Sequence, residues 1–108
     1  MTPIKALKER FDRDSLSLKW GSVASDLLRL SSMAGAPKPQ CETIQGVLTE
    51  TKHFTEWLAP QVDLEKQKTI LSLQRVLVQL SSKASSFKEF KATTLRWSDK
   101  ILRISGLM

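Results

Sequence analysis

The sequence predicts an all-α fold, an antiparallel up-and-down four-helix bundle that forms one domain over residues 1–108. Two observations predict it. In four segments, apolar residues recur at steps of three and four over several turns, which is the pattern of helices that bury one face. Stretches rich in glycine, proline or serine separate these segments, and the alternation typical of a strand persists nowhere.

The first main helix is expected over residues 15–33. Its apolar stripe is Leu16, Trp20, Val23, Leu27 and Leu30, widened by Ala24 and Leu28. Several small residues on this helix would allow a neighbouring helix to approach closely: Gly21, Ser22, Ala24 and Ser25. Gly35 permits a left-handed C-cap, and two prolines beyond it prevent the helix from continuing.

The other three main helices are expected over residues 40–59, 63–81 and 87–105. The second carries the stripe Ile44, Val47, Leu48, Thr51, Phe54 and Leu58. The third, after Pro60 and the N-cap candidate Asp63, carries Ile70, Leu73, Leu77 and Leu80, broadened by Leu64, Leu71 and Val78. The fourth carries Phe87, Phe90, Thr94, Trp97, Ile101 and Ile104.

A short extra helix at the N-terminus is consistent with the stripe Ile4, Leu7 and Phe11, with Thr2 as its cap. Extending that stripe does not lead to the residues that the next helix buries. We therefore expect a break over residues 12–15, with Asp14 or Ser15 as a new cap. A single long helix with a widened face is the alternative.

The connection over residues 81–86 contains neither glycine nor proline. The apolar seam shifts there by about half a turn, which favours a tight link between two antiparallel helices. The alternative is one helix of roughly 40 residues, which would expose a long apolar face and require a partner chain.

Composition limits the class of protein. A hydrophobic fraction of 41% and a charged fraction of 26% are ordinary for a globular domain. Cys41 is the only cysteine, so an intrachain disulfide is impossible and a reducing compartment, the cytoplasm, is expected. We find no secretory signal and no apolar run near the roughly 20 residues needed to span a bilayer.

The sequence offers no obvious catalytic or metal-binding constellation. His53 is the only histidine, and the pair that it forms with Glu50 lacks the second histidine of a di-iron bundle site, so a surface histidine beside a carboxylate is expected. Cys41 has no resolving cysteine and is expected to be a small half-buried residue. No phosphate-binding glycine loop and no paired buried carboxylates are recognisable. We expect neither an enzyme nor a cofactor.

The net charge of +6 favours acidic partners in general. On the last helix Arg96, Lys100 and Arg103 fall on one side, interrupted by Asp99, and form a candidate basic patch. The neighbouring aromatic residues belong to the apolar stripe, so base stacking is not supported. A small nucleic-acid-associated protein is therefore the second hypothesis.

The sequence contains more apolar residues than the core of one four-helix bundle needs, and this excess says more about function than the charge does. Such residues outside the monomer core mark an interface. The candidate interface residues, all on the last two main helices or just after them, are Leu64, Leu71, Val78, Leu95, Leu102 and Leu107. The alternative is that the helices have broad buried faces and that all of these residues lie in the core of the monomer. The leading hypothesis is a non-enzymatic helical adaptor or regulator that binds another protein or itself as a homodimer.

Overall fold

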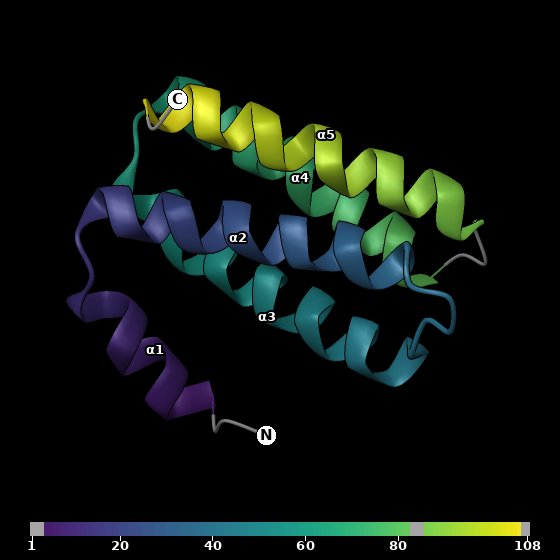
Figure 1. Ribbon diagram of the computed structural model, residues 1–108. Coiled ribbons are helices and arrows are strands. Elements are labelled where there is room, and N and C mark those ends of the chain that lie inside the picture. The colour runs from purple at the N-terminus through teal and green to yellow at the C-terminus, as the bar shows by residue number, and fades with distance from the viewer. Residues whose placement is uncertain (1–3, 83–85, 107–108) are drawn as a thin grey trace.

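The computed structural model describes residues 4–82 and 86–106, and every regular element in these ranges is helical. In chain order they are α1 (Ile4–Arg13), α2 (Leu16–Ala34), α3 (Cys41–Leu58), the 3-10 turn η1 (Ala59–Gln61), α4 (Leu64–Ser82) and α5 (Phe87–Ser105) (Figure 1). The all-α prediction is confirmed, and the bounds of the four main helices agree with the expected ones to within two residues.

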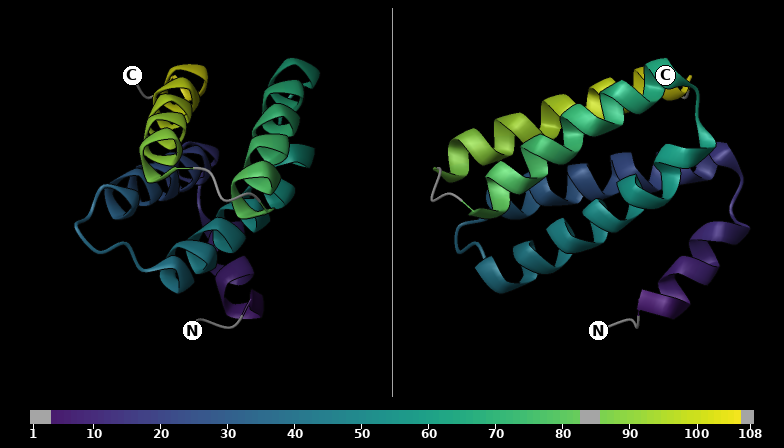
Figure 2. Two further views of the ribbon diagram at one scale, coloured as in Figure 1. Left: turned by 90° about the vertical axis from the view of Figure 1, so that its right-hand side faces the viewer. Right: turned by 180° about the vertical axis from the view of Figure 1, so that it is seen from behind.

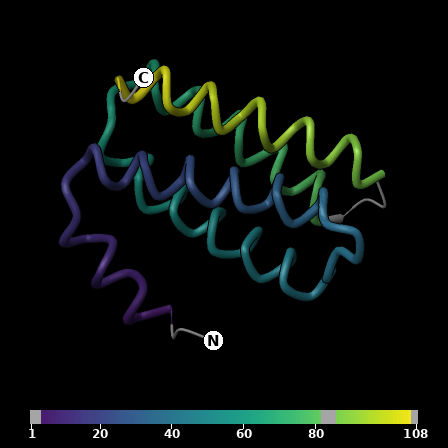
Figure 3. Tube along the Cα trace, in the orientation of Figure 1, coloured from purple at the N-terminus to yellow at the C-terminus, as the bar shows by residue number. Residues whose placement is uncertain are grey.

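The helices are arranged in two layers. Figure 2 shows α4 and α5 in one layer over α2 and α3, with α1 beyond the second layer. The trace in Figure 3 shows that the connection from α2 to α3 and the connection from α3 to α4 lie at opposite ends of the molecule. The most extensive helix contacts are those of α2 with α5, followed by those of α2 with α3. In the part of the chain that is described, no helix has the length and apolarity required to cross a bilayer.

The buried apolar residues form one core cluster, which receives side chains from each of the helices α1 to α5. Its members that are fully shielded from solvent include Leu27, Leu30, Leu48, Leu58, Leu73, Leu77 and Ile101. Each leucine of this kind stabilises the folded state by roughly 1.5–3 kcal/mol relative to an exposed one. Buried threonines do not leave polar groups unsatisfied, because the hydroxyls of Thr51 and Thr94 donate to the carbonyls of Val47 and Phe90 in their own helices.

Small residues let α5 approach the backbone of α2. The hydroxyl of Ser98 donates to the carbonyl oxygen of Ala24 at 2.9 Å, and that of Ser31 donates to the carbonyl of Lys91 at 3.1 Å. Both bonds join a short side chain to the main chain of the other helix, which requires closely spaced axes. The prediction that small residues on this helix permit close packing is thus confirmed for Ala24.

The break between the first two helices occurs where the apolar stripe predicts it. Helix α1 ends at Arg13, and Ser15 has extended backbone angles, φ −64° and ψ 163°, with its side chain accepting from the amide of Leu18. The alternative of one long helix is wrong. Helix α1 packs through Phe11, whose ring stacks on Phe54 with the centroids 4.8 Å apart. The predicted cap Thr2 lies outside the described residues.

Local caps also start the two later helices. Asp63 accepts from the amide of Lys66 at 3.0 Å, as predicted for α4. Ser86 is extended, and its hydroxyl accepts from the amide of Glu89 at 3.2 Å, so α5 begins anew at Phe87. A continuous helix through residues 81–86 is therefore wrong, although residues 83–85 themselves lie outside the described part.

The predicted left-handed cap at Gly35 is wrong. This glycine has φ −85° and ψ −2°, a right-handed conformation, and its amide hydrogen-bonds to carbonyls in the last turn of α2. Instead, the absence of a side chain leaves space for Lys91, whose ammonium lies 3.0 Å from the position that a Cβ would take. The left-handed C-cap occurs after α5, at Gly106 with φ 78°.

Several residues assigned to the core stripes are exposed. The sequence placed them on the buried side of their helices, but neighbouring helices cover only part of each stripe. They are Leu16, Leu28 and Phe87. Conversely Leu102, predicted to be surplus, is half-buried and packs against the core. Helical periodicity therefore places the centre of each buried face correctly and its edges incorrectly.

Candidate functional site

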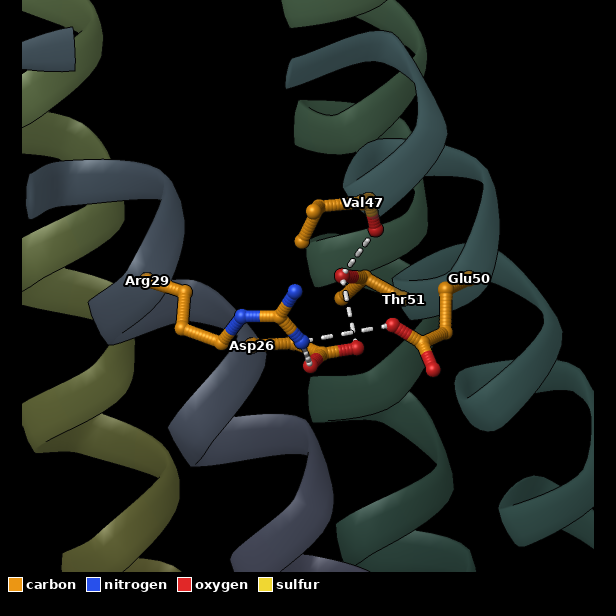
Figure 4. Close-up of polar contacts among 5 residues, drawn as sticks. All are labelled: Asp26, Arg29, Val47, Glu50 and Thr51. Carbon is orange, nitrogen blue, oxygen red and sulfur yellow. Dashed lines mark hydrogen bonds and ion pairs between the residues drawn. The ribbon is translucent and has the colours of Figure 1, made fainter. Parts of the chain in front are cut away.

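A cluster of polar side chains lies between α2 and α3 (Figure 4). Asp26 on α2 is the centre of the cluster, and its side chain is only 6% exposed. Arg29, one turn further along α2, donates to Asp26 Oδ1 at 3.2 Å and lies 3.6 Å from Glu50 Oε2 on α3. The guanidinium therefore bridges two carboxyl groups from different helices. Asp26 is the buried member of this carboxyl pair, whereas the Glu50 side chain is 24% exposed.

Burial raises the pKa of Asp26 to about 7, from an ordinary value of 3.8, and the nearby Glu50 carboxylate adds to this rise. The Arg29 guanidinium acts in the opposite direction. The effect of Arg29 on the pKa is smaller than that of Glu50, because the Arg29 side chain is 57% exposed and solvent screens its charge. Asp26 consequently retains its proton at pH values where an exposed aspartate is fully ionised.

Thr51 on α3 supplies a hydrogen-bond partner for Asp26. Its hydroxyl donates to the Val47 carbonyl at 2.7 Å, and its oxygen lies 3.4 Å from Asp26 Oδ2. The Thr51 hydroxyl also donates toward Asp26 Oδ2, which favours the ionised carboxylate and lowers the pKa of Asp26, whereas the hydrogen bond with Glu50 raises it. The arrangement links α2 to α3 without an uncompensated buried charge.

The cluster borders an open hollow of about 370 Å³ formed by α1, α2 and α3. Its lining combines cations, carboxyl groups and small or apolar residues: Arg10, Leu18, Gly21, Ser22, Ser25, Asp26, Arg29, Glu50 and Phe54. A carboxyl group with a pKa near 7 is suited to proton transfer in principle. Asp26 is already engaged by Arg29 and Thr51, however, so the contacts support a structural link between helices.

Sequence reasoning missed this cluster, although part of its signal was visible. Asp26 lies three residues after Val23 and four before Leu30, which places it on the buried side of α2. A carboxyl group at such a position indicates a buried partner or a shifted pKa. What sequence alone could not supply was the partner, because Glu50 is brought to Asp26 only by the packing of α3.

The structure divides the candidate interface residues between two surfaces. Leu71 and Val78 line an open hollow of about 420 Å³ on α4, together with Gln74, Arg75 and Gln79. Leu95 and Leu102 line a different hollow of about 500 Å³, where Leu28 of α2 completes the apolar lining. Leu64 is exposed at the start of α4, and Leu107 lies outside the described residues.

The candidate basic patch occupies the outward side of α5. Arg96, Lys100 and Arg103 are all exposed. Two of them already have intramolecular contacts: Arg103 pairs with Asp99 at 3.1 Å, and the ammonium of Lys100 lies 4.8 Å from the centre of the Trp97 ring. Asp99 therefore offsets part of the charge of this patch, as the sequence indicated.

His53 and Cys41 have surroundings that differ from those expected. His53 is half-buried, stacks on Trp57 with ring centroids 5.4 Å apart, and lies 3.6 Å from Glu56, whereas Glu50 belongs to the Asp26 cluster. Cys41 is exposed, not half-buried, at the start of α3. Within residues 4–82 and 86–106, no group of three or more histidine, cysteine or acidic side chains is arranged to hold a metal ion.

No protein-family model, curated protein or solved structure matches this chain. Its function has to be inferred from its own surfaces. Two features of the described residues bear on function. The polar groups of the Asp26 cluster bond to one another, and several apolar residues of α4 and α5 are exposed.

Proposed function

We propose that this protein is a non-enzymatic helical adaptor or regulator that acts by binding another protein. The observation that carries the proposal is the outer face of α4. Leu64, Leu71 and Val78 are exposed to 68, 52 and 55%, although they recur every seven residues on one side of the helix. A regular apolar row of this kind is typical of a surface that another helix covers.

The same helix supplies the core from its opposite side. Ile70, Leu73 and Leu77 are almost completely shielded from solvent. Among the described residues, helix α4 therefore has one apolar side that is buried and a second that is exposed. An apolar side that remains exposed on such a helix is a candidate surface for protein binding. A partner protein on the outer face would complete this pattern.

A second apolar surface supports the proposal independently. Leu28, Leu95 and Leu102 line the hollow of about 500 Å³ between α2 and α5. Leu28 and Leu95 are exposed at its edge, and Leu102 is half-buried. Two separate apolar surfaces suit an adaptor, which holds two binding partners, better than a protein with one ligand.

The proposal includes the scaffold and the compartment predicted from the sequence. An antiparallel up-and-down four-helix bundle would present α4 and α5 as rigid binding surfaces. The exposed thiol of Cys41, the only cysteine, suits a reducing compartment, so we place the protein in the cytoplasm.

Capture from an extract of the native cells tests the proposal. The extract is treated with nuclease, and proteins retained by the immobilised wild-type chain are compared with those retained by the Leu71→Lys, Leu95→Lys double variant. Both leucines are exposed, so the variant is expected to fold normally. A protein that the wild type retains and the variant does not would support the proposal. Identical retention by the two chains would contradict it.

The homodimer version has its own measurement. Light scattering at high protein concentration gives the molar mass in solution. A mass equal to that of one 12.2 kDa chain removes the homodimer and leaves binding to another protein. A doubled mass that returns to 12.2 kDa in the double variant supports self-association through these leucines.

A small nucleic-acid-associated protein is the second candidate. It is favoured by the common outward exposure of Arg96, Lys100 and Arg103 on α5. Retention on DNA or RNA that weakens with salt and is lost in the Arg96→Glu, Arg103→Glu variant would support it. Absence of binding at low salt would exclude it.

A further inference from the structure

We infer that the outer face of α4 binds an acidic amphipathic helix of another protein. The inference rests on the proposed function, because it names the class of partner for one of the two apolar surfaces. It is drawn from the charges that border the leucine row and from the spacing of the row itself.

The charged residues that flank the row closely are both cations. At about 100° per residue, Lys68 and Arg75 lie within roughly 60° of the line through Leu64, Leu71 and Val78. The nearest acidic residue of the same helix, Glu65, is about 120° from that line. Lys68 and Arg75 are exposed, and within the described ranges neither takes part in an ion pair. Their charges are thus available to a partner.

The other edge of the face is polar and also lacks an acidic group. It is formed by Gln74, whose amide donates to the hydroxyl of Thr55 on α3, and by Ser81, which accepts from the ammonium of Lys52 at 3.1 Å. Each of these residues is held against α3. The cationic edge is therefore the one that faces solvent and selects the charge of a partner.

A second copy of this chain fits the face poorly. It would present the same two cations, Lys68 and Arg75, beside the same leucine row, with no acidic residue in that sector to pair with them. Like charges placed across an interface oppose association, whereas opposite charges steer it. A helix that carries glutamate or aspartate beside its apolar stripe satisfies both the leucines and the cations.

The spacing of the row sets the length of the partner. Three apolar residues seven positions apart extend over about 21 Å of helix. Side chains from a partner helix crossing at a shallow angle can fill the gaps between them in the manner of a coiled coil. The hollow of about 420 Å³ at Leu71 and Val78 marks one such gap. A partner helix of about 15 residues or more is required.

Two synthetic peptides test the inference. Both are 21-residue helices with leucine at two positions in every seven; one has glutamate at the positions flanking the leucines, and the other has lysine there. Like charges keep each peptide from pairing with itself. Binding of the fluorescently labelled peptides to the full chain is measured by anisotropy. We expect the wild type to bind the acidic peptide about tenfold more tightly than the basic one, and the difference to shrink in high salt.

Matched variants locate the binding. Lys68→Glu with Arg75→Glu should reverse the peptide preference. Leu71→Lys should weaken binding of the acidic peptide about tenfold or more, whereas Leu95→Lys, at a leucine of almost equal exposure on α5, should leave it unchanged. Unchanged thermal unfolding in these variants verifies that each is folded.

Three outcomes would overturn the inference: equal affinity for the two peptides, no binding of either up to about 1 mM, or loss of binding in Leu95→Lys but not in Leu71→Lys. A dimer abolished by Leu71→Lys would also overturn it, by showing that a second copy is the occupant. The capture experiment then judges the proposed function separately, since a retained protein of other chemistry would support an adaptor without an acidic helix.

Discussion

Helices α2 and α4 each contain 19 residues and are rich in leucine, yet their surroundings differ. Helix α2 contacts both α5 and α3 extensively and buries even polar side chains, among them Asp26 and Ser31. Helix α4 contacts α3, α5 and the turn η1, but each of these contacts is less extensive than those of α2. In its described part it buries apolar residues on one side and exposes Leu64, Leu71 and Val78 on the other.

The difference shows that helix position, more than composition, decides what a leucine does in this chain. On α2, a helix with neighbours on two sides, a residue inside the apolar stripe is buried even when it is a carboxylic acid. On α4, leucines beside the stripe remain in solvent. Stability should therefore depend mainly on α2 and its contacts, whereas binding to a partner should depend on α4.

Truncating one leucine in each helix should give the largest contrast. Leu27→Ala on α2 removes a side chain with no solvent exposure and should lower the free energy of unfolding by about 3 to 5 kcal/mol. Leu71→Ala on α4 removes an exposed side chain and should change it by about 0.5 kcal/mol. Urea titrations of both variants supply the comparison. Equal losses would show that α4 is more enclosed than its exposed leucines indicate.

The buried carboxyl group of α2 should make stability depend on pH. The pKa of Asp26 is about 7 in the folded chain and 3.8 in the unfolded one, so between these values the folded state holds a proton that the unfolded state has lost. The contribution of Asp26 to stability is therefore complete below pH 3.8, falls as the pH rises to about 7, and is constant above it. The total decrease is at most roughly 4 kcal/mol.

Asp26→Asn isolates this contribution, because asparagine has a similar shape and does not titrate. The free energy of unfolding of the variant, measured relative to the wild type, should rise between pH 4 and 7 and level off above. Asp12→Asn is the matched control, since Asp12 is exposed on α1 and pairs only with Lys8. If the profiles of the wild type and Asp26→Asn run parallel, Asp26 does not hold its proton in the folded state.

The sequence was sufficient for features that depend on neighbours a few residues away. Ser15, Asp63 and Ser86 each accept a hydrogen bond from the amide three residues further on. The first residues of α2, α4 and α5 are therefore set by interactions between residues close in sequence. The apolar stripes likewise depend on residues only three or four positions apart. Bounds that agree to within two residues follow from these signals.

Features that depend on contacts between helices were not predictable in the same way. Gly35 was expected to be left-handed, but its role is to leave space for Lys91 of α5. Leu16 and Leu28 were placed in the core because a helical wheel does not show how far the neighbouring helices extend over each face. Asp26 was visible as an acid on the buried side of α2, whereas its pairing with Glu50 arises only from the packing of α3.

The smallest effect expected from the contrast between α2 and α4 concerns their caps. Ser15 starts α2, and the buried residues Lys19 and Trp20 follow in the first turns of this helix. Ser15→Ala should therefore lower the global free energy of unfolding by about 1 kcal/mol. Asp63 starts α4, whose first fully buried side chain is Ile70. The first turn of α4 can therefore open without disturbing the core.

Asp63→Ala should consequently act locally. We expect faster hydrogen exchange at the amides of residues 66–69 and a global loss below that of Ser15→Ala. Asparagine is an equally effective cap, so Asp63→Asn should leave exchange nearly unchanged. If Asp63→Ala lowers global stability as much as Ser15→Ala does, the first turn of α4 unfolds only with the whole bundle. In that case the outer face of α4 would be a rigid binding surface along its entire length, including Leu64.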